Sequence, residues 1–294
     1  MADALATTVT LNLLTRVRVL VKNQLQKLEP LLGDGGNLEQ LMPGKMLRTR
    51  LVARLADADP SRVPLATLER ACAATEIVHT ASLCHDDVID NGLVRRAKTT
   101  LWCATTPSAA VLVGDALLCD ALLLLQGAEG GRYVGPFLAK VREVCTAEAD
   151  QELKFRGKEL DEATCLRLAR SKTGPLFAFA ASVCGGDDAD LSASLEEAGY
   201  RIGTAYQIAD DVLDVAGCEE AAGKTLRTDV LRRKFTLPQA PQTGPDIARE
   251  HIRGLCNSAI DCLADQPALR KGLERFFSQD LQPIFDRCDL QPGL

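Results

Sequence analysis

The sequence predicts an all-α fold, in which a single domain of 294 residues forms a bundle of helices. Three observations favour this fold. Alanine and leucine, both strong helix formers, dominate the composition, and aromatic residues make up only 4%. Apolar residues recur with the helical period along nearly the whole chain. The interruptions are mostly short and rich in Gly, Pro or Asp, as in the connections of a helical bundle.

The periodic segments predict helices at residues 5–31, 45–57, 64–91, 107–126, 132–155, 161–184, 189–217, 247–264 and 267–286. Clusters of helix-breaking residues separate them, such as "GDGG" at 33–36 and "GAEGG" at 127–131. One connection is long and rich in charge, Gly and Pro. Because long loops in compact domains often bind or cover ligands, we expect a flexible active-site loop at about 218–245.

The composition excludes some classes of protein. A net charge of -6 argues against a general nucleic-acid binder. The eleven cysteines occur singly, without the Cys-x-x-Cys spacing of a zinc site, which suits a reducing compartment. The N-terminus lacks the layout of a signal peptide. The most apolar stretch, Ala109–Leu125, contains two aspartates and is too short to span a bilayer. We therefore expect a buried core helix there, no integral membrane segment and a cytoplasmic protein.

Two acidic motifs occur far apart in the chain, "DDVID" at 86–90 and "DDVLD" at 210–214. Each follows an apolar helical segment and places carboxylates at i, i+1 and i+4, on one face of a helix. Gln207 extends the second motif as part of the same polar stripe. Like charges at this spacing, near a helix C-terminus, destabilise the helix unless a cation is bound. A solvated helix end would explain one such motif, but two copies favour cation binding.

The ligand type indicates which cation. Carboxylates without His or Cys favour Mg²⁺ over zinc or copper. Magnesium keeps several waters and usually shares its coordination sphere with substrate phosphates. We therefore expect both motifs to bind metal together with a diphosphate, through Asp86, Asp87, Asp90, Asp210, Asp211 and Asp214.

A diphosphate site also needs cationic side chains. His79 precedes Asp86 by seven residues, so it lies on the same helix face, about 10 Å along the axis. Each basic residue taken alone is more simply explained as a solvated surface residue, and only their combination with the acidic motifs favours binding. The candidates are Lys45 and Arg48 in "GKMLR", Arg95 and Arg96 in "VRR", Lys172 with Thr173 in "SKTG", and Lys224 and Lys234 in the long loop.

From about Gly44 to Pro238 the motifs resemble those of the trans-prenyl diphosphate synthases, the head-to-tail isoprenoid chain-elongating enzymes. "GKMLR" resembles the Gly-Lys-x-x-Arg-Pro element, and "DDVID…RR" the first aspartate-rich motif with its arginines. "GDALL", "EADQ" and "KTGPLF" resemble further elements in the family's order. "QIADDVLD" resembles the second aspartate-rich motif, and "GKTLRTDVLRRKFTLP" the loop that follows it.

The resemblance implies a fold of the isoprenoid synthase type with a central active-site cavity, and a homodimer. It implies a prenyltransferase that condenses isopentenyl diphosphate with an allylic diphosphate (dimethylallyl, geranyl or farnesyl). Three Mg²⁺ ions would be bound with the diphosphate. The implied product is a longer all-trans prenyl diphosphate.

The resemblance also assigns roles to individual residues. The six aspartates would hold the metal, and Asp86, Asp87, Asp90, Lys172, Gln207 and Asp210 would be catalytic. The allylic diphosphate would be contacted by Arg95, Lys172, Thr173, Gln207, Lys224 and Lys234. Isopentenyl diphosphate would be bound by Lys45, Arg48, His79 and Arg96, and Gln151 would lie near the reacting carbons. The departures are Thr49 for a proline, and Ala97 and Arg233 for glycines, and none of them removes a charged ligand.

Product length depends, in this family, on the residues one or two turns before the first aspartates. Here these are Val78, Ala81 and Ser82, with no aromatic side chain, which indicates a product longer than C15. Leucines on the next helix, Leu118 and Leu122, would alternatively form the floor, and this leaves C20 open.

Two other functions fit parts of the sequence. A terpene cyclase of the same fold would need one aspartate-rich motif but no second basic cluster. A catalytically weak partner subunit of a heteromeric synthase would have lost aspartates, whereas this chain keeps all six.

Overall fold

The observed helices follow the predicted ones closely, and the all-α prediction is confirmed. The computed structural model describes residues 2–32, 36–96, 98–216, 234–241 and 243–286. Its longer helices are α1 (Ala2–Leu28), α2 (Leu47–Ala58), α3 (Leu65–Ile89), α5 (Pro107–Gln126), α6 (Val134–Ala149), α7 (Glu162–Val183), α8 (Ala189–Ala216), α11 (Pro245–Asp261) and α12 (Pro267–Phe276). The chain divides into two compact units, Met1–Pro136 and Phe137–Leu294. The single-domain expectation stays a prediction.

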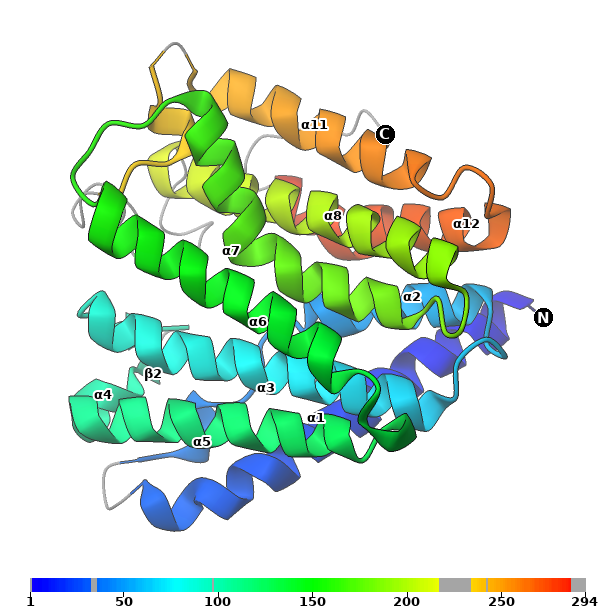
Figure 1. Cartoon of the computed structure of the whole chain (residues 1–294), viewed down its shortest axis with the longest axis horizontal. Helices are drawn as coiled ribbons and strands as arrows, with labels where there is room; N and C mark the ends of the chain where they lie inside the picture. The colour runs from blue at the N-terminus through cyan, green and yellow to red at the C-terminus, as the bar shows by residue number, and fades with distance from the viewer. Residues whose placement is uncertain (1, 33–35, 97, 217–233, 242, 287–294) are drawn as a thin grey trace. The chain divides into compact units, whose positions relative to one another are not determined.

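Helices α1, α2, α3 and α5 build the first unit (Figure 1), in which α3 packs along α5 and α1 contacts α2 and α3. On α1, Leu13, Val17, Val21 and Leu25 are fully buried. Their spacing of four residues places them on one face of the helix. The buried stripe therefore fixes which side of α1 meets the core of this unit.

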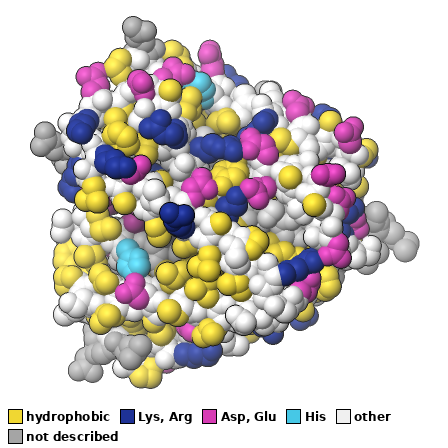
Figure 2. All heavy atoms as spheres, viewed as in Figure 1, with side chains coloured by type: hydrophobic (Ala, Val, Ile, Leu, Met, Phe, Trp, Pro, Cys, Tyr) yellow, Lys and Arg dark blue, Asp and Glu magenta, His cyan; other side chains and the backbone are white. Residues whose placement is uncertain are grey.

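Helix α5 is apolar on its exposed side as well as on its buried side. It has 20 residues, and its most apolar 18-residue window has a mean hydropathy of 2.0, so by length and composition alone it could cross a membrane, yet only 39% of that window is buried. Leu112 and Leu123 are 66% and 69% exposed. Figure 2 shows hydrophobic side chains gathered over the area in which Figure 1 draws α5. The expectation of a buried core helix therefore holds for one face only, and the absence of a membrane segment stays a prediction.

Close approach of α7 and α8 organises the second unit, in which α11 also packs against α8. A Cβ at Gly203 would lie 2.6 Å from Cα of Gly174, and one at Gly199 would lie 2.6 Å from Cα of Ala178. Any side chain at these glycines would separate the two helices. Helix α6 joins them through Phe137, whose ring centroid is 4.7 Å from that of Phe179 on α7.

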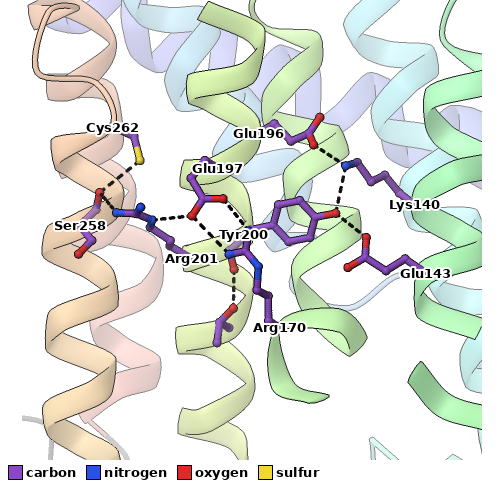
Figure 3. Close-up of polar contacts among 10 residues, drawn as sticks. Lys140, Glu143, Arg170, Glu196, Glu197, Tyr200, Arg201, Ser258 and Cys262 are labelled. Atoms are coloured by element: carbon purple, nitrogen blue, oxygen red, sulfur yellow. Dashed lines mark hydrogen bonds and ion pairs between the residues drawn. The ribbon is translucent and has the colours of Figure 1, made fainter. Parts of the chain in front are cut away.

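A polar network also joins four helices of this unit (Figure 3). Tyr200 of α8 lies between two cations, with Nζ of Lys140 (α6) 4.7 Å and Cζ of Arg170 (α7) 4.2 Å from its ring centroid. Its hydroxyl donates to Glu143 of α6. The neighbouring Arg201 pairs with Glu197 on its own helix and donates to the carbonyl of Ser258 on α11. The network thus ties α6, α7 and α11 to one turn of α8.

Some local features were not predicted. After α3, strands β1 (Val94–Arg95) and β2 (Lys98–Thr99) pair antiparallel and a short helix α4 (Leu101–Ala104) follows. The predicted helix 132–155 ends as a π-helix, η4 (Asp150–Phe155). The predicted helix 267–286 is divided by a second π-helix, η6 (Phe277–Leu281), before α13 (Gln282–Phe285). Each π-helix inserts a residue into a helical pattern and shifts the face that follows.

Candidate active site

The first acidic motif lies at the C-terminal end of α3. Asp90 is the C-cap residue that follows the last helical position, Ile89, and its N–H donates to the carbonyl of Asp86. Asn91 then turns the chain with a φ of 51°, which brings the β1–β2 hairpin back to the motif. Asp86 and Asp90 are half-buried, whereas Asp87 is buried. The three carboxylates therefore share a helix end but differ in their access to solvent.

Arg95 of β1 returns to the buried carboxylate of this motif. Its Nε donates to Oδ1 of Asp87 at 2.8 Å, and its Nη2 lies 2.7 Å from the same oxygen. Burial alone would lower the pKa of Arg95, but the hydrogen bond to Asp87 and the charges of the three aspartates raise it above its ordinary value. Burial, followed by the charge of Asp87, raises the pKa of the nearby Cys84 thiol to about 12, so this thiol stays protonated.

A basic cluster surrounds His79, one to two turns before the acidic motif. Burial lowers the pKa of His79 well below its ordinary value, and the charges of Arg48, Arg96 and Arg95 lower it further. The imidazole is therefore neutral at pH 7 and can donate one hydrogen bond and accept another. Arg48 comes from the first turn of α2, so α2, α3 and the hairpin together form this cluster.

The glycine of "GKMLR" makes room for an arginine of the cluster. A Cβ at Gly44 would lie 2.7 Å from Cζ of Arg96, and Nη1 of Arg96 donates to the carbonyl of Met42 at 3.0 Å. Arg96 itself has a φ of 52°. Lys45, next to this glycine, is exposed. All four residues predicted to bind isopentenyl diphosphate thus belong to the first unit. They are His79 itself, Arg48 and Arg96 near it, and Lys45.

The residues predicted to set product length lie on both packed helices of this unit. Val78 and Ala81 on α3 are buried, and the Ser82 hydroxyl donates to the carbonyl of His79 at 2.9 Å. Leu118 and Leu122 on α5 are half-buried. Both sets therefore belong to one pair of packed helices, and their role in setting product length stays a prediction.

Among the described residues of the second unit, the predicted phosphate-binding lysines Lys172 and Lys234 are paired with glutamates. Nζ of Lys172 (α7) donates to Gln151 at 2.6 Å and lies 3.1 Å from Oε1 of Glu148. Nζ of Lys234 lies 2.8 Å from Oε1 of Glu152, and both side chains are largely buried. Glu148, Gln151 and Glu152 share one face at the junction of α6 and η4.

A second chain of contacts connects Thr173 to the second acidic motif. The Thr173 hydroxyl donates to Oε1 of Gln207, and Nε2 of Gln207 donates to Oδ1 of Asp211 at 2.8 Å. Asp211 and Asp214 are buried and Asp210 is half-buried. Burial, followed by the charge of Asp211, raises the pKa of the Cys165 thiol to about 11. Within the predicted stripe of Gln207, Asp210, Asp211 and Asp214, a hydrogen bond thus joins Gln207 to Asp211 on α8, and the role of the stripe stays a prediction.

The predicted metal ligands do not form a finished metal site by themselves. Over the described ranges, no three Asp, Glu, His or Cys side chains are arranged to hold an ion. The donor set nevertheless fits Mg²⁺, because it consists of carboxylate oxygens and because Asp86, Asp90 and Asp210 retain some exposure. Water and phosphate oxygens usually complete such a sphere. The assignment of these aspartates to metal stays a prediction.

Some residues fall outside these observations or were missed. Lys224, Ala97 and Arg233 lie outside the described residues. The partners of the two lysines, Glu148 and Glu152, were not predicted, although their spacing around Gln151 is a helical signal that could have indicated them.

Comparison with known proteins agrees with this geometry. The polyprenyl synthetase family profile matches residues 36–251. The chain is 36% identical over 167 residues to octaprenyl diphosphate synthase of Haemophilus influenzae, covering 55% of this chain and 50% of that protein. It is 34% identical over 203 residues to geranylgeranyl diphosphate synthase of Mycobacterium tuberculosis, covering 66% and 57%. The chain thus spans about half the length of these relatives.

A solved structure extends the likeness over the whole fold. The polyprenyl synthase of Caulobacter crescentus, crystallised with calcium and isoprenyl diphosphate, superposes with a TM-score of 0.73 at 25% identity, covering 99% of this chain and 98% of that one. The isoprenoid synthase type of fold is therefore confirmed. Since the family profile also covers most of the chain, including both acidic motifs, the chain belongs to the polyprenyl synthetase family.

Proposed function

We propose that this chain is an Mg²⁺-dependent prenyltransferase that condenses isopentenyl diphosphate with an allylic diphosphate. The observation that carries the proposal is that α3, in the first unit, has an acidic C-terminal end and a basic cluster one to two turns earlier. Asp86, Asp87 and Asp90 form an acidic end with Arg95, while the neutral His79 lies among arginines one to two turns earlier. Metal-bound and metal-free diphosphates need these two different environments.

The acidic end would bind the allylic diphosphate. Its carboxylates would hold Mg²⁺, which neutralises charge on the departing diphosphate. The allylic C–O bond would break and its electron pair would leave with the diphosphate, to which Arg95 would donate hydrogen bonds. Asp210 and its neighbours in the second motif would bind metal in the same way. We propose that three ions are bound.

The basic cluster would hold isopentenyl diphosphate as the nucleophile. Arg48, Arg96 and Lys45 supply charge for its diphosphate, and the neutral His79 supplies one directed hydrogen bond. The double bond of isopentenyl diphosphate forms the new C–C bond with the allylic carbon. Loss of one proton to the released diphosphate then restores a double bond, so no protein base is required. The chain's contribution is mainly orientation and charge stabilisation.

The product is proposed to be all-trans and longer than C15. Ala81 and Val78 are buried, and neither they nor Ser82 carries an aromatic ring that would block a growing chain. Leu118 and Leu122 on α5 are the alternative floor, which would correspond to a C20 product.

We further propose a cytoplasmic homodimer that binds neither nucleic acid nor membrane as an integral protein. The exposed leucines of α5 support a contact with a second copy, since exposed apolar faces commonly mark interfaces. The free cysteines among the described residues support a reducing compartment. Sedimentation of the wild type and of L112D/L123D tests the contact, because a dimer through α5 becomes a monomer in the variant.

One incubation tests the proposed activity directly. The purified chain is mixed with Mg²⁺, isopentenyl diphosphate and each of dimethylallyl, geranyl and farnesyl diphosphate, and the products are sized. We expect products longer than C15, and none when EDTA removes the metal. D86N should lower turnover at least 100-fold, whereas D246N, an exposed aspartate of α11, should not.

The rival functions give different results in the same incubation. Cyclic hydrocarbon formed from the allylic substrate alone would indicate a terpene cyclase. No product, with activity restored only by adding a second prenyl synthase subunit, would indicate a partner subunit.

A further inference from the structure

A buried glutamate of α3 caps the first turn of α2. The Thr49 hydroxyl donates to Oε1 of Glu76 at 2.8 Å, and the Thr49 backbone N–H lies 3.3 Å from the same oxygen. Glu76 is 2% exposed and Thr49 is fully buried. A buried carboxylate is costly unless hydrogen bonds satisfy it. The hydroxyl and the backbone N–H of Thr49 therefore both donate to one carboxylate oxygen that is almost inaccessible to solvent.

Helix α2 needs a cap from elsewhere because its own N-cap residue supplies none. That residue is Met46, which has a left-handed backbone (φ 52°) and no side-chain oxygen. The first N–H groups of a helix have no partner within the helix, and they carry its positive dipole end. Thr49 is the third residue of α2. The carboxylate of Glu76, although 27 residues away in sequence, thus takes the position that a capping side chain normally occupies.

The capped turn carries part of the basic cluster. Arg48 immediately precedes Thr49, and His79 follows Glu76 by three residues, so it lies one turn along α3. The charge of Arg48 already acts on the imidazole of His79. A contact that fixes Thr49 against Glu76 therefore also fixes the distance and direction of Arg48 relative to His79.

We propose that Thr49 and Glu76 are positioning residues that align Arg48 with His79 for binding the diphosphate of isopentenyl diphosphate. The inference rests on the proposed function and concerns only the metal-free diphosphate. Thr49 stands where the motif otherwise has proline, which offers neither an N–H nor a hydroxyl. The contact is therefore a feature of this chain's own sequence. Its loss should weaken isopentenyl diphosphate binding and leave the allylic substrate unaffected.

The test compares three variants in steady-state kinetics with both substrates varied. T49V removes the hydroxyl at nearly constant volume, T49S restores it, and E76Q keeps one acceptor oxygen without the charge. We expect T49V to raise KM for isopentenyl diphosphate roughly tenfold, as expected for one lost charge-assisted hydrogen bond. KM for the allylic diphosphate should change less than twofold, T49S should return to the wild-type value, and E76Q should be intermediate.

Thr75 provides a matched control. It is also fully buried, and its hydroxyl donates to a backbone carbonyl of its own helix, that of Ala71. T75V should leave both KM values unchanged. A rise of both KM values in T49V, or a T75V variant that behaves like T49V, would show that the contact only stabilises the fold. Either result would overturn the proposal.

A binding measurement separates this proposal from the proposed function. Isopentenyl diphosphate is titrated into wild type, T49V and T49S by calorimetry without metal or allylic substrate. Weaker binding in T49V alone supports the positioning role, and equal binding in all three overturns it. A wild type that forms no condensation product overturns the proposed function, whatever the titrations show.

Discussion

Oδ1 of Asp87 accepts two contacts from one guanidinium, at 2.8 Å from Nε and 2.7 Å from Nη2 of Arg95. The carboxylate is buried and the arginine is partly exposed. The predicted metal ligand and the predicted phosphate ligand thus hold each other. If Asp87 binds metal as proposed, this ion pair would have to rearrange.

Removing the arginine should affect stability and binding together. In R95Q the buried carboxylate loses its charged partner, and the free energy of unfolding should fall by about 1–2 kcal/mol. KM for the allylic diphosphate should rise more than KM for isopentenyl diphosphate. Urea denaturation and steady-state kinetics measure the two effects. K98Q is the control, since Lys98 and its partner Glu39 are both exposed and should matter little. Equal effects in both variants would contradict the special role of the pair.

The neutral state of His79 should make stability depend on pH. The folded pKa is lowered by burial and by Arg48, Arg96 and Arg95, whereas in the unfolded chain it returns to about 6.5. Protonation then favours the unfolded state, so His79 costs no stability above pH 6.5 and an increasing amount as pH falls below it. H79Q should lose less unfolding free energy than the wild type between pH 7 and pH 5. Identical slopes would show that His79 titrates normally.

The close approach of α7 and α8 should tolerate no added methyl group. A Cβ at Gly203 would lie 2.6 Å from Cα of Gly174 and 2.8 Å from the Thr173 carbonyl. Both are backbone atoms, so G203A should lower the free energy of unfolding by about 1–3 kcal/mol through overpacking. It should also lower turnover, because the contact of Thr173 with Gln207 is displaced.

Another glycine supplies the control for this variant. Gly254 lies inside α11, and a Cβ there would meet nothing within 4 Å. G254A should therefore stabilise the chain by about 0.5–1 kcal/mol, the difference in helix propensity. Thermal melts of both variants check the opposite signs, and destabilisation by G254A would undermine the steric argument.

In the Tyr200 network of Figure 3, the hydroxyl and the ring of Tyr200 should make separate contributions to the free energy of unfolding. Y200F loses the contacts of the hydroxyl with Glu143 and Lys140. This should cost about 1 kcal/mol of unfolding free energy. Y200L also loses the ring between Lys140 and Arg170 and should cost about 1–2 kcal/mol more. Chemical denaturation measures the loss of unfolding free energy in both variants. Equal losses would show that the ring itself contributes nothing.

A bulky residue at position 81 should shorten the product. Ala81 is buried on α3, less than two turns before Asp86, so the ring in A81F would occupy the space in which the chain is proposed to grow. Products should shorten by at least one isoprene unit in chromatographic sizing. If the leucines of α5 form the floor instead, A81F should leave the length unchanged and L118A/L122A should increase it.

Helix positions were predictable because they depend on local pattern. The helix predicted at 107–126 matches α5 end to end, and α3 ends two residues before its predicted boundary because the chain turns at Asn91. The π-helix at Asp150–Phe155 was not predictable, since the sequence pattern of its residues is that of an ordinary helix.

Side-chain partners were far less predictable than side-chain roles. The sequence indicated Asp87, Arg95 and Lys172 through their motifs, but not that Glu76 caps α2 or that Glu152 meets Lys234. Contacts between residues tens of positions apart depend on how helices pack, and spacing along the chain carries no record of that. Similarly, the apolar pattern of α5 predicted a helix but did not indicate which side of it would remain exposed.

The pairing of Lys172 with Glu148, and of Lys234 with Glu152, has a consequence for how fast substrate arrives. Paired lysines present little net positive field beyond their immediate neighbourhood, and the chain as a whole is negative. Long-range attraction of a bare diphosphate should therefore be weak in the second unit. Association of a bare diphosphate should therefore not slow as ionic strength rises, and it should be fastest for a diphosphate whose charge a divalent ion has already reduced in solution.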